Sequence, residues 1–136
     1  QGVVAMLSFG LCGGLDPALK AGDLILPTRV IAAGSKSLTC DPDWTGRLED
    51  ALGDMVTRKE ATLAHSPTIV AGPRRKSVLR ATTEADAVDM ESYAVGRAAR
   101  KAGDIGNLLA LGRGSTRALK VLRDVARRLG PGVAFG

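Results

Sequence analysis

Asp89, Met90 and Glu91 place two carboxylates and a thioether in three successive positions. Residues 85–88 before them, apolar except for Asp86, predict the end of a buried strand, and residues 91–102 predict a helix whose last turns carry cations that suit the helix dipole. A strand that turns into a helix here would set an acidic side chain at the carboxyl edge of a sheet, where open α/β sheets bind ligands. The alternative is an exposed acidic helix start, since Asp and Glu are common at that position.

A glycine-rich loop is the second candidate for ligand contact. The apolar run at residues 2–9 predicts a strand buried on both faces, and it opens into Gly-Leu-Cys-Gly-Gly at residues 10–14. Glycines let a backbone turn sharply and let a ligand approach its N–H groups. The loop lacks the Gly-Lys-Ser/Thr of a Walker motif and the Gly-x-Gly-x-x-Gly of a dinucleotide fingerprint. It is therefore either a simple turn or a binding loop of another kind.

Other segments must position these two motifs. Residues 24–33 are β-prone but are interrupted by Pro27, and Asp41 marks a helix start as an acidic cap followed by proline. Residues 66–72 predict a short strand, and residues 73–81 predict a short basic helix that begins with proline.

Composition narrows the class of protein. The 136 residues suffice for one domain with a real core, and 45% hydrophobic with 24% charged residues is ordinary globular composition. Cys12 and Cys40 make no disulfide framework, so we expect free thiols and a cytoplasmic location. His65, the only histidine, has no metal-binding partner at ligand spacing, so we predict no metal site. No apolar run reaches about 18 residues and no signal peptide is evident, so we expect no membrane span.

The positive charge lies mainly at the C-terminal end. Residues 113–128 hold six basic residues and one acid, which accounts for the net charge of +5. Residues 111–129 predict a basic amphipathic helix, because the apolar positions fall within roughly 120° of a helical wheel. The helix either docks on the core with a solvated basic face or makes peripheral contact with an anionic membrane or an acidic partner. We predict no nucleic-acid binding, because no known motif is present and aromatic residues are few.

Two stretches together resemble the purine nucleoside phosphorylase and nucleosidase superfamily. Residues 8–23 resemble its glycine loop, Gly-x-Ala-Gly-Gly-Leu followed by Lys-x-Gly-Asp, and residues 87–92 resemble its Val-Glu/Asp-Met-Glu motif, in the same order. With the Arg-rich C-terminal segment, they are similar to the hopanoid-associated phosphorylase branch. The resemblance implies one nucleoside phosphorylase-like domain over residues 1–136. Its fold would be a three-layer α/β/α arrangement around a central mixed sheet, incomplete in this chain.

The resemblance implies cleavage of the ribosyl N-glycosidic bond of a purine (adenosyl) nucleoside-type substrate, by phosphorolysis or hydrolysis. The implied catalytic residue is Glu91, whose carboxylate would bind the 2′ and 3′ hydroxyls and favour the positive charge that develops on the sugar. Met90 would offer a soft apolar surface to the ribose. The remaining implied substrate-binding residues are Cys12, Gly13 and Gly14 through their backbone, and Ile69 and Val70 beside the base.

The suggested branch implies a role in hopanoid lipid biosynthesis. An adenosyl-lipid substrate would give the basic helix at residues 111–129 a purpose at a membrane surface. Phosphate would be a co-substrate in phosphorolysis, and no other cofactor is implied. The family also implies a homo-oligomer.

The chain departs from the family pattern at several positions. Leu11 stands where the family has Ser or Thr near the phosphate or the attacking water. The family's general acid is an aspartate on a strand after the helix, and we expect no such strand between residues 103 and 107, so Asp104 is not given that role. We expect chain segments to be missing near residues 65–66 and 103–105, and the family's earlier glycine-containing strand to be absent. The alternative is a non-catalytic nucleoside-binding or oligomerisation module derived from the same fold.

Overall fold

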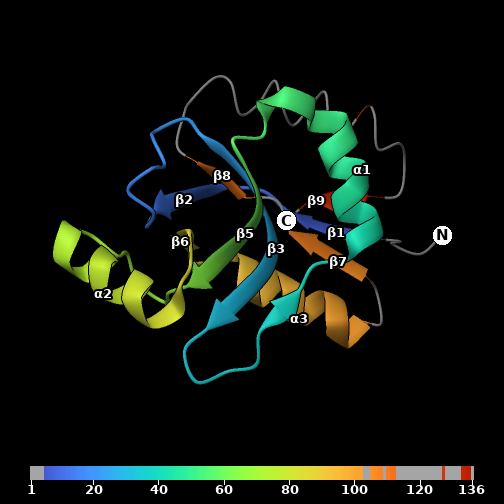
Figure 1. Ribbon diagram of the computed structural model, residues 1–136. Helices are drawn as coiled ribbons and strands as arrows, with labels where there is room; N and C mark the ends of the chain where they lie inside the picture. The colour runs from blue at the N-terminus through green and yellow to red at the C-terminus, as the bar shows by residue number, and fades with distance from the viewer. Residues whose placement is uncertain (1–4, 103–104, 109, 113–126, 128–132, 136) are drawn as a thin grey trace.

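The computed structural model describes residues 5–102, 105–108, 110–112, 127 and 133–135 (Figure 1). The helices are α1 (Pro42–Leu52), the 3-10 helix η1 (Gly53–Met55), α2 (Pro73–Thr83) and α3 (Ser92–Ala102). The strands are β1 (Ala5–Ser8), β2 (Leu11–Gly14), β3 (Leu24–Ala32), β4 (Leu38–Thr39), β5 (Arg58–His65), β6 (Ala87–Asp89), β7 (Ile105–Leu108), β8 (Ala110–Gly112) and β9 (Val133–Phe135). Within these residues, no helix is both long and apolar enough to cross a membrane.

The strands form a mixed sheet in two parts. One part is parallel, with the order β7-β1-β9, and the other has the order β4-β3-β5-β6-β2-β8. An additional pairing of β3 with β8 closes β3, β5, β6, β2 and β8 into a ring. Strand β1 runs parallel to β7, and the strands that follow them, β2 and β8, are also parallel to each other. The two chain segments therefore pass side by side from the first part into the ring. The mixed sheet predicted above is confirmed.

Helices cover both sides of the first part. Leu7 of β1 packs with Leu48 and Leu52 of α1. The next residue, Ser8, has its hydroxyl 3.2 Å from that of Ser92 at the start of α3. Because successive side chains of a strand point to opposite faces, α1 and α3 lie on opposite faces of β1. Figure 1 shows α2 beside the ring, on the side away from α1, and the three-layer prediction is confirmed.

Local sequence signals explain the helix starts but not the segment between β5 and α2. The Asp41 carboxylate accepts the backbone N–H of Trp44 at 3.0 Å and caps α1, as predicted. The strand predicted at residues 66–72 is wrong, because no strand forms there. The Ser66 hydroxyl donates to the Thr68 carbonyl at 2.6 Å, so this side chain satisfies the backbone locally and replaces a strand partner.

Two predictions for the end of the chain need correction. The expectation of no strand between residues 103 and 107 is wrong, because β7 pairs in parallel with β1 and Ser8 lies opposite Leu108. The sequence of this four-residue strand has little strand pattern of its own, so the strand depends on its pairing with the buried strand β1. The predicted helix at 111–129 cannot begin at Leu111, since Leu111 and Gly112 belong to β8. Apart from Arg127, the rest of that predicted helix lies outside the described residues.

Candidate active site

The Asp-Met-Glu turn joins β6 to α3, as the sequence predicts. The carboxylate of Asp89 holds the first residue of the helix, because its Oδ2 accepts the backbone N–H of Ser92 at 3.1 Å and also the Ser92 hydroxyl in a short hydrogen bond. The backbone carbonyl of Asp89 accepts the N–H of Ser66 at 2.9 Å. These bonds fix Met90 and Glu91, both exposed, at the end of the strand.

Sheet pairing brings the glycine loop to this turn, because residues 11–14 of that predicted loop form the strand β2. Gly13 lies opposite Val88 and Gly14 opposite Ala87 in the antiparallel pairing of β2 with β6. The two motifs are far apart in the sequence but adjacent in the sheet. A Cβ added at Gly13 would already lie 3.4 Å from Val88, so a side chain larger than methyl there would have to extend into the space beside the strands.

A cavity of about 580 Å³ lies between these elements. Five of the predicted site residues line it, namely Gly13, Ile69, Val70, Met90 and Glu91. The other two, Cys12 and Gly14, line a second cavity of about 490 Å³ instead. Each cavity is of a size typical of small-molecule sites. Leu11, Gly13 and Ile69 line both cavities, so the two share a wall.

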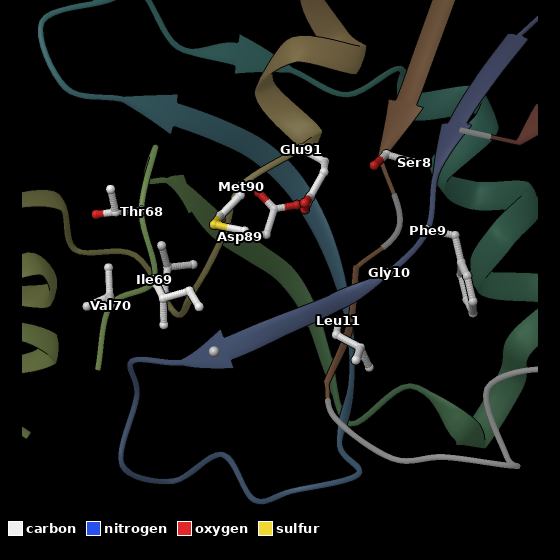
Figure 2. Close-up of a pocket in the computed structure, with 12 residues that line it drawn as sticks. Ser8, Phe9, Gly10, Leu11, Thr68, Ile69, Val70, Asp89, Met90 and Glu91 are labelled. Atoms are coloured by element: carbon white, nitrogen blue, oxygen red, sulfur yellow. The ribbon is translucent and has the colours of Figure 1, made fainter. Parts of the chain in front are cut away.

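The side chains around the first cavity differ in direction. Figure 2 shows Ile69 pointing into the pocket, whereas Thr68 and Val70 point the other way. Val70 packs against the hydrophobic cluster that includes Leu15 and Val88, so its side chain supports the wall of the cavity. Figure 2 also shows the side chains of Asp89 and Glu91 extending from the turn toward the side where Ser8 lies.

Asp89 is buried beside this cavity and was not among the predicted site residues. Burial raises its pKa, the hydrogen bonds from Ser92 oppose that rise, and the negative charge of Glu91 adds to it. Its Oδ1 is buried and has no hydrogen-bond partner within the described part of the chain, whereas Oδ2 has two. The turn therefore concentrates negative charge at one end of the cavity, where a ligand that carries hydroxyl donors or developing positive charge would be favoured.

Ser8 and Ser92 were also missed by the sequence-based prediction. Both are buried, and their hydroxyl groups continue the hydrogen-bonded chain that begins at Asp89. A signal was present for Ser8, which is the one hydroxyl residue in the apolar run at residues 2–9. A polar side chain within a buried strand needs a partner and marks a position worth examining.

Cys12 and Leu11 limit what the glycine loop can do. Burial, reinforced by the charge of Asp89, raises the pKa of Cys12 to about 12, so the thiol is neutral near pH 7 and is not an activated nucleophile. Leu11 is 59% exposed and lines both cavities. Among the described residues, no group of three His, Cys, Asp or Glu side chains could hold a metal ion.

Asp89→Asn is expected to raise the melting temperature by about 2–5 °C at pH 7. The raised pKa means that folding disfavours the charged form. That penalty is absent below the ordinary aspartate pKa of about 3.9 and grows as pH rises through the raised value. The gain should therefore vanish near pH 3.5 in thermal melts at both pH values. A similar gain at both pH values, or one matched by the exposed control Asp54→Asn, would refute the argument.

Comparison with known proteins agrees with the fold described above. The sequence model described as "Phosphorylase superfamily" matches residues 1–110. A mutant futalosine hydrolase of Helicobacter pylori superposes with a TM-score of 0.76 at 19% identity, covering 93% of this chain and 65% of that one. None of the curated proteins matches the chain in sequence.

Two further solved structures are similar. An S-adenosylhomocysteine nucleosidase from Streptococcus pyogenes, in complex with 5-methylthiotubericidin, has a TM-score of 0.77 at 18% identity, over 93% of this chain and 69% of that one. An AMP nucleosidase from Bacteroides thetaiotaomicron has a TM-score of 0.75 at 20% identity, over 93% of this chain and 60% of that one. The chain thus spans about 60–69% of the length of these three proteins.

Proposed function

Because the chain belongs to the phosphorylase superfamily, we propose that it cleaves the N-glycosidic bond of a purine nucleoside-type substrate. The observation that supports this most directly is the shared cavity of the two motifs. Glu91 and Met90 from one motif and Gly13 from the other line it, and Ile69 points into it (Figure 2). The pairing of Gly13 with Val88 holds the two motifs side by side.

The proposed mechanism begins with the sugar. The carboxylate of Glu91 is exposed to the cavity and accepts hydrogen bonds from the 2′ and 3′ hydroxyls of ribose, which orient the ring. Cleavage of the N–C bond leaves the bonding electron pair on the departing base and positive charge on the sugar, and the negative charges of Glu91 and Asp89 stabilise that sugar. The carboxylate of Asp89 keeps a fixed position, because it accepts a hydrogen bond from the backbone N–H of Ser92.

The base occupies the other end of the cavity in this proposal. Ile69 offers an apolar surface to the ring, and the exposed side chain of Met90 covers the ribose. Among the described residues, Asp89 and Glu91 are the carboxyl groups that line this cavity. The chain's own contribution is therefore positioning and charge at the sugar, and either phosphate or water is the second reactant.

Finer parts of the proposal rest on the family resemblance and on sequence patterns alone. They are an adenosyl-lipid substrate in hopanoid biosynthesis, phosphate as co-substrate, assembly into a homo-oligomer, and a cytoplasmic protein with peripheral membrane contact. The segment proposed for that contact, residues 111–129, lies mostly outside the described residues.

Release of adenine from an adenosyl nucleoside is the test. We expect the purified chain to release adenine, followed by chromatography over hours, in buffer with and without phosphate. Ribose 1-phosphate as co-product would identify phosphorolysis, and free ribose would identify hydrolysis. Calorimetry with the same nucleoside provides the second measurement.

A non-catalytic nucleoside-binding or oligomerisation module is the second candidate. Leu11 favours it, because an exposed leucine lines the cavity where a hydroxyl would assist phosphate or water. Binding in the calorimeter without product after hours would support this alternative and refute the enzymatic proposal. Neither binding nor product would refute both nucleoside-based proposals.

A further inference from the structure

The second cavity differs in charge from the first. Its lining includes Lys20 and Lys76, whereas the first cavity is lined by Asp89 and Glu91. Within the described part of the chain, neither lysine lies within ion-pair distance of a carboxylate. Asp23 also lines the second cavity, but its Oδ2 accepts the backbone N–H of Lys20 at 2.8 Å.

The start of α2 adds to the positive charge. Its first residues after Pro73 are Arg74, Arg75 and Lys76, and its first turn has no acidic residue. Gly72 at the cap provides no side-chain hydrogen bond. Cations at the N-terminus of a helix oppose the helix dipole, so this arrangement costs stability unless negative charge comes to it. A ligand in the cavity beside Lys76 could supply that charge.

The shared wall sets which part of a substrate would reach the lysines. Gly13 and Ile69 line both cavities, and the proposed function places the base against Ile69. Glu91 lines only the first of the two, where the sugar would lie. A group that enters the second cavity must therefore extend from the base, on the side away from the ribose diol. The thiol of Cys12 in its wall is neutral near pH 7 and does not repel an anion.

We infer that the second cavity binds an anionic substituent on the base. The inference rests on the proposed function and specifies its substrate as a purine nucleoside whose base carries a carboxylate or a similar acidic group. Lys20 and Lys76 are specificity-determining residues that bind this group by charge-assisted hydrogen bonds. They take no part in the bond cleavage itself.

The test compares adenosine with an adenosine that carries a succinyl group, hence two carboxylates, on N6. We expect the unmodified protein to favour the succinyl derivative about tenfold or more in kcat/KM, and in Kd by calorimetry. The double variant Lys20→Met/Lys76→Met should lose this preference and leave the values for adenosine unchanged. Added salt should weaken the preference of the unmodified protein.

Lys36→Met is the matched control. Lys36 is exposed and lines neither cavity. Its contact with the Tyr93 hydroxyl is made by the backbone carbonyl, which accepts that hydrogen bond, so the substitution leaves the contact in place. An equal ratio for the two nucleosides in the unmodified protein would overturn the inference, as would a ratio unchanged in the double variant. In either case cleavage of adenosine would leave the proposed function standing. If neither nucleoside is bound or cleaved, the proposed function fails and this inference fails with it.

Discussion

Glu91→Gln is expected to lower kcat/KM for nucleoside cleavage by about 10²–10³-fold. The amide keeps the size of the side chain but removes the negative charge that would hold two ribose hydroxyls and stabilise the charged sugar. The fold should not change, because Glu91 is exposed and the hydrogen bonds that begin α3 come from Asp89. Initial rates of adenine release, together with a thermal melt, provide the measurement.

The matched control is Glu84→Gln, an exposed glutamate at the end of α2 that does not line either cavity. Its rate should equal that of the unmodified protein. Loss of the charge on Glu91 also removes one cause of the raised pKa of Asp89, so Asp89 should titrate at lower pH in the variant. Full turnover by Glu91→Gln would remove this residue from the mechanism.

Arg58→Met is expected to cause the largest loss of stability among these variants. One guanidinium nitrogen, Nη1, lies 2.6 Å from Oδ2 of Asp16 and 2.6 Å from Oδ1 of Asp86. The backbone carbonyl of Asp86 accepts the N–H groups of Leu15 and Asp16, directly after the glycine loop. Without Arg58, two neighbouring and largely buried carboxylates keep Arg80 as their one shared cation among the described residues. We expect the melting temperature to fall by about 5–10 °C at pH 7.

Lys59→Met on the same strand is the control, since Lys59 is more exposed and lies 4.0 Å from its partner Glu49. Such surface pairs contribute little, so the melting temperature of Lys59→Met should hardly differ from that of the unmodified protein.

The pKa of Asp16 is lowered, first by the N–H of Ala18 and further by Arg58. This stabilisation is complete above the ordinary pKa of about 3.9 and is lost as pH falls through the lower value of the folded state. The difference between Arg58→Met and the unmodified protein should therefore shrink below pH 4, and a constant difference would contradict this explanation.

Local patterns were sufficient to predict some elements. The cap at Asp41 and the strand-to-helix turn at Asp89 depend on neighbours in sequence, and both are present. The mixed sheet followed from the family resemblance. The strand β7 was missed because a short segment such as Ile105–Leu108 becomes a strand only through its partner β1. Residues 66–72 were wrongly predicted because the bond from Ser66 to its own loop outweighs their β-propensity.

The site was also predictable only in part, because local patterns identify residues but not their contacts with distant segments. Type and order of residues singled out Glu91 and Gly13, but only the register of β2 on β6 shows that they share a cavity. No local pattern distinguishes Gly13, which lines both cavities, from Gly14, which lines only the second. The positions of Ser8 and Ser92 relative to Asp89 depend on how α3 packs on β1, which a sequence pattern does not encode.

The closed ring of strands has a consequence for how the chain can be shortened. Strand β8 lies between β2 and β3, with Leu111 opposite both Leu11 and Leu24. A truncation ahead of Ala110 would leave the N–H and C=O groups of two strands without partners. Such open edges recruit strands from other molecules and promote aggregation. The three residues of β8 thus cover the edges of β2 and β3, and we expect them to protect the protein from aggregation.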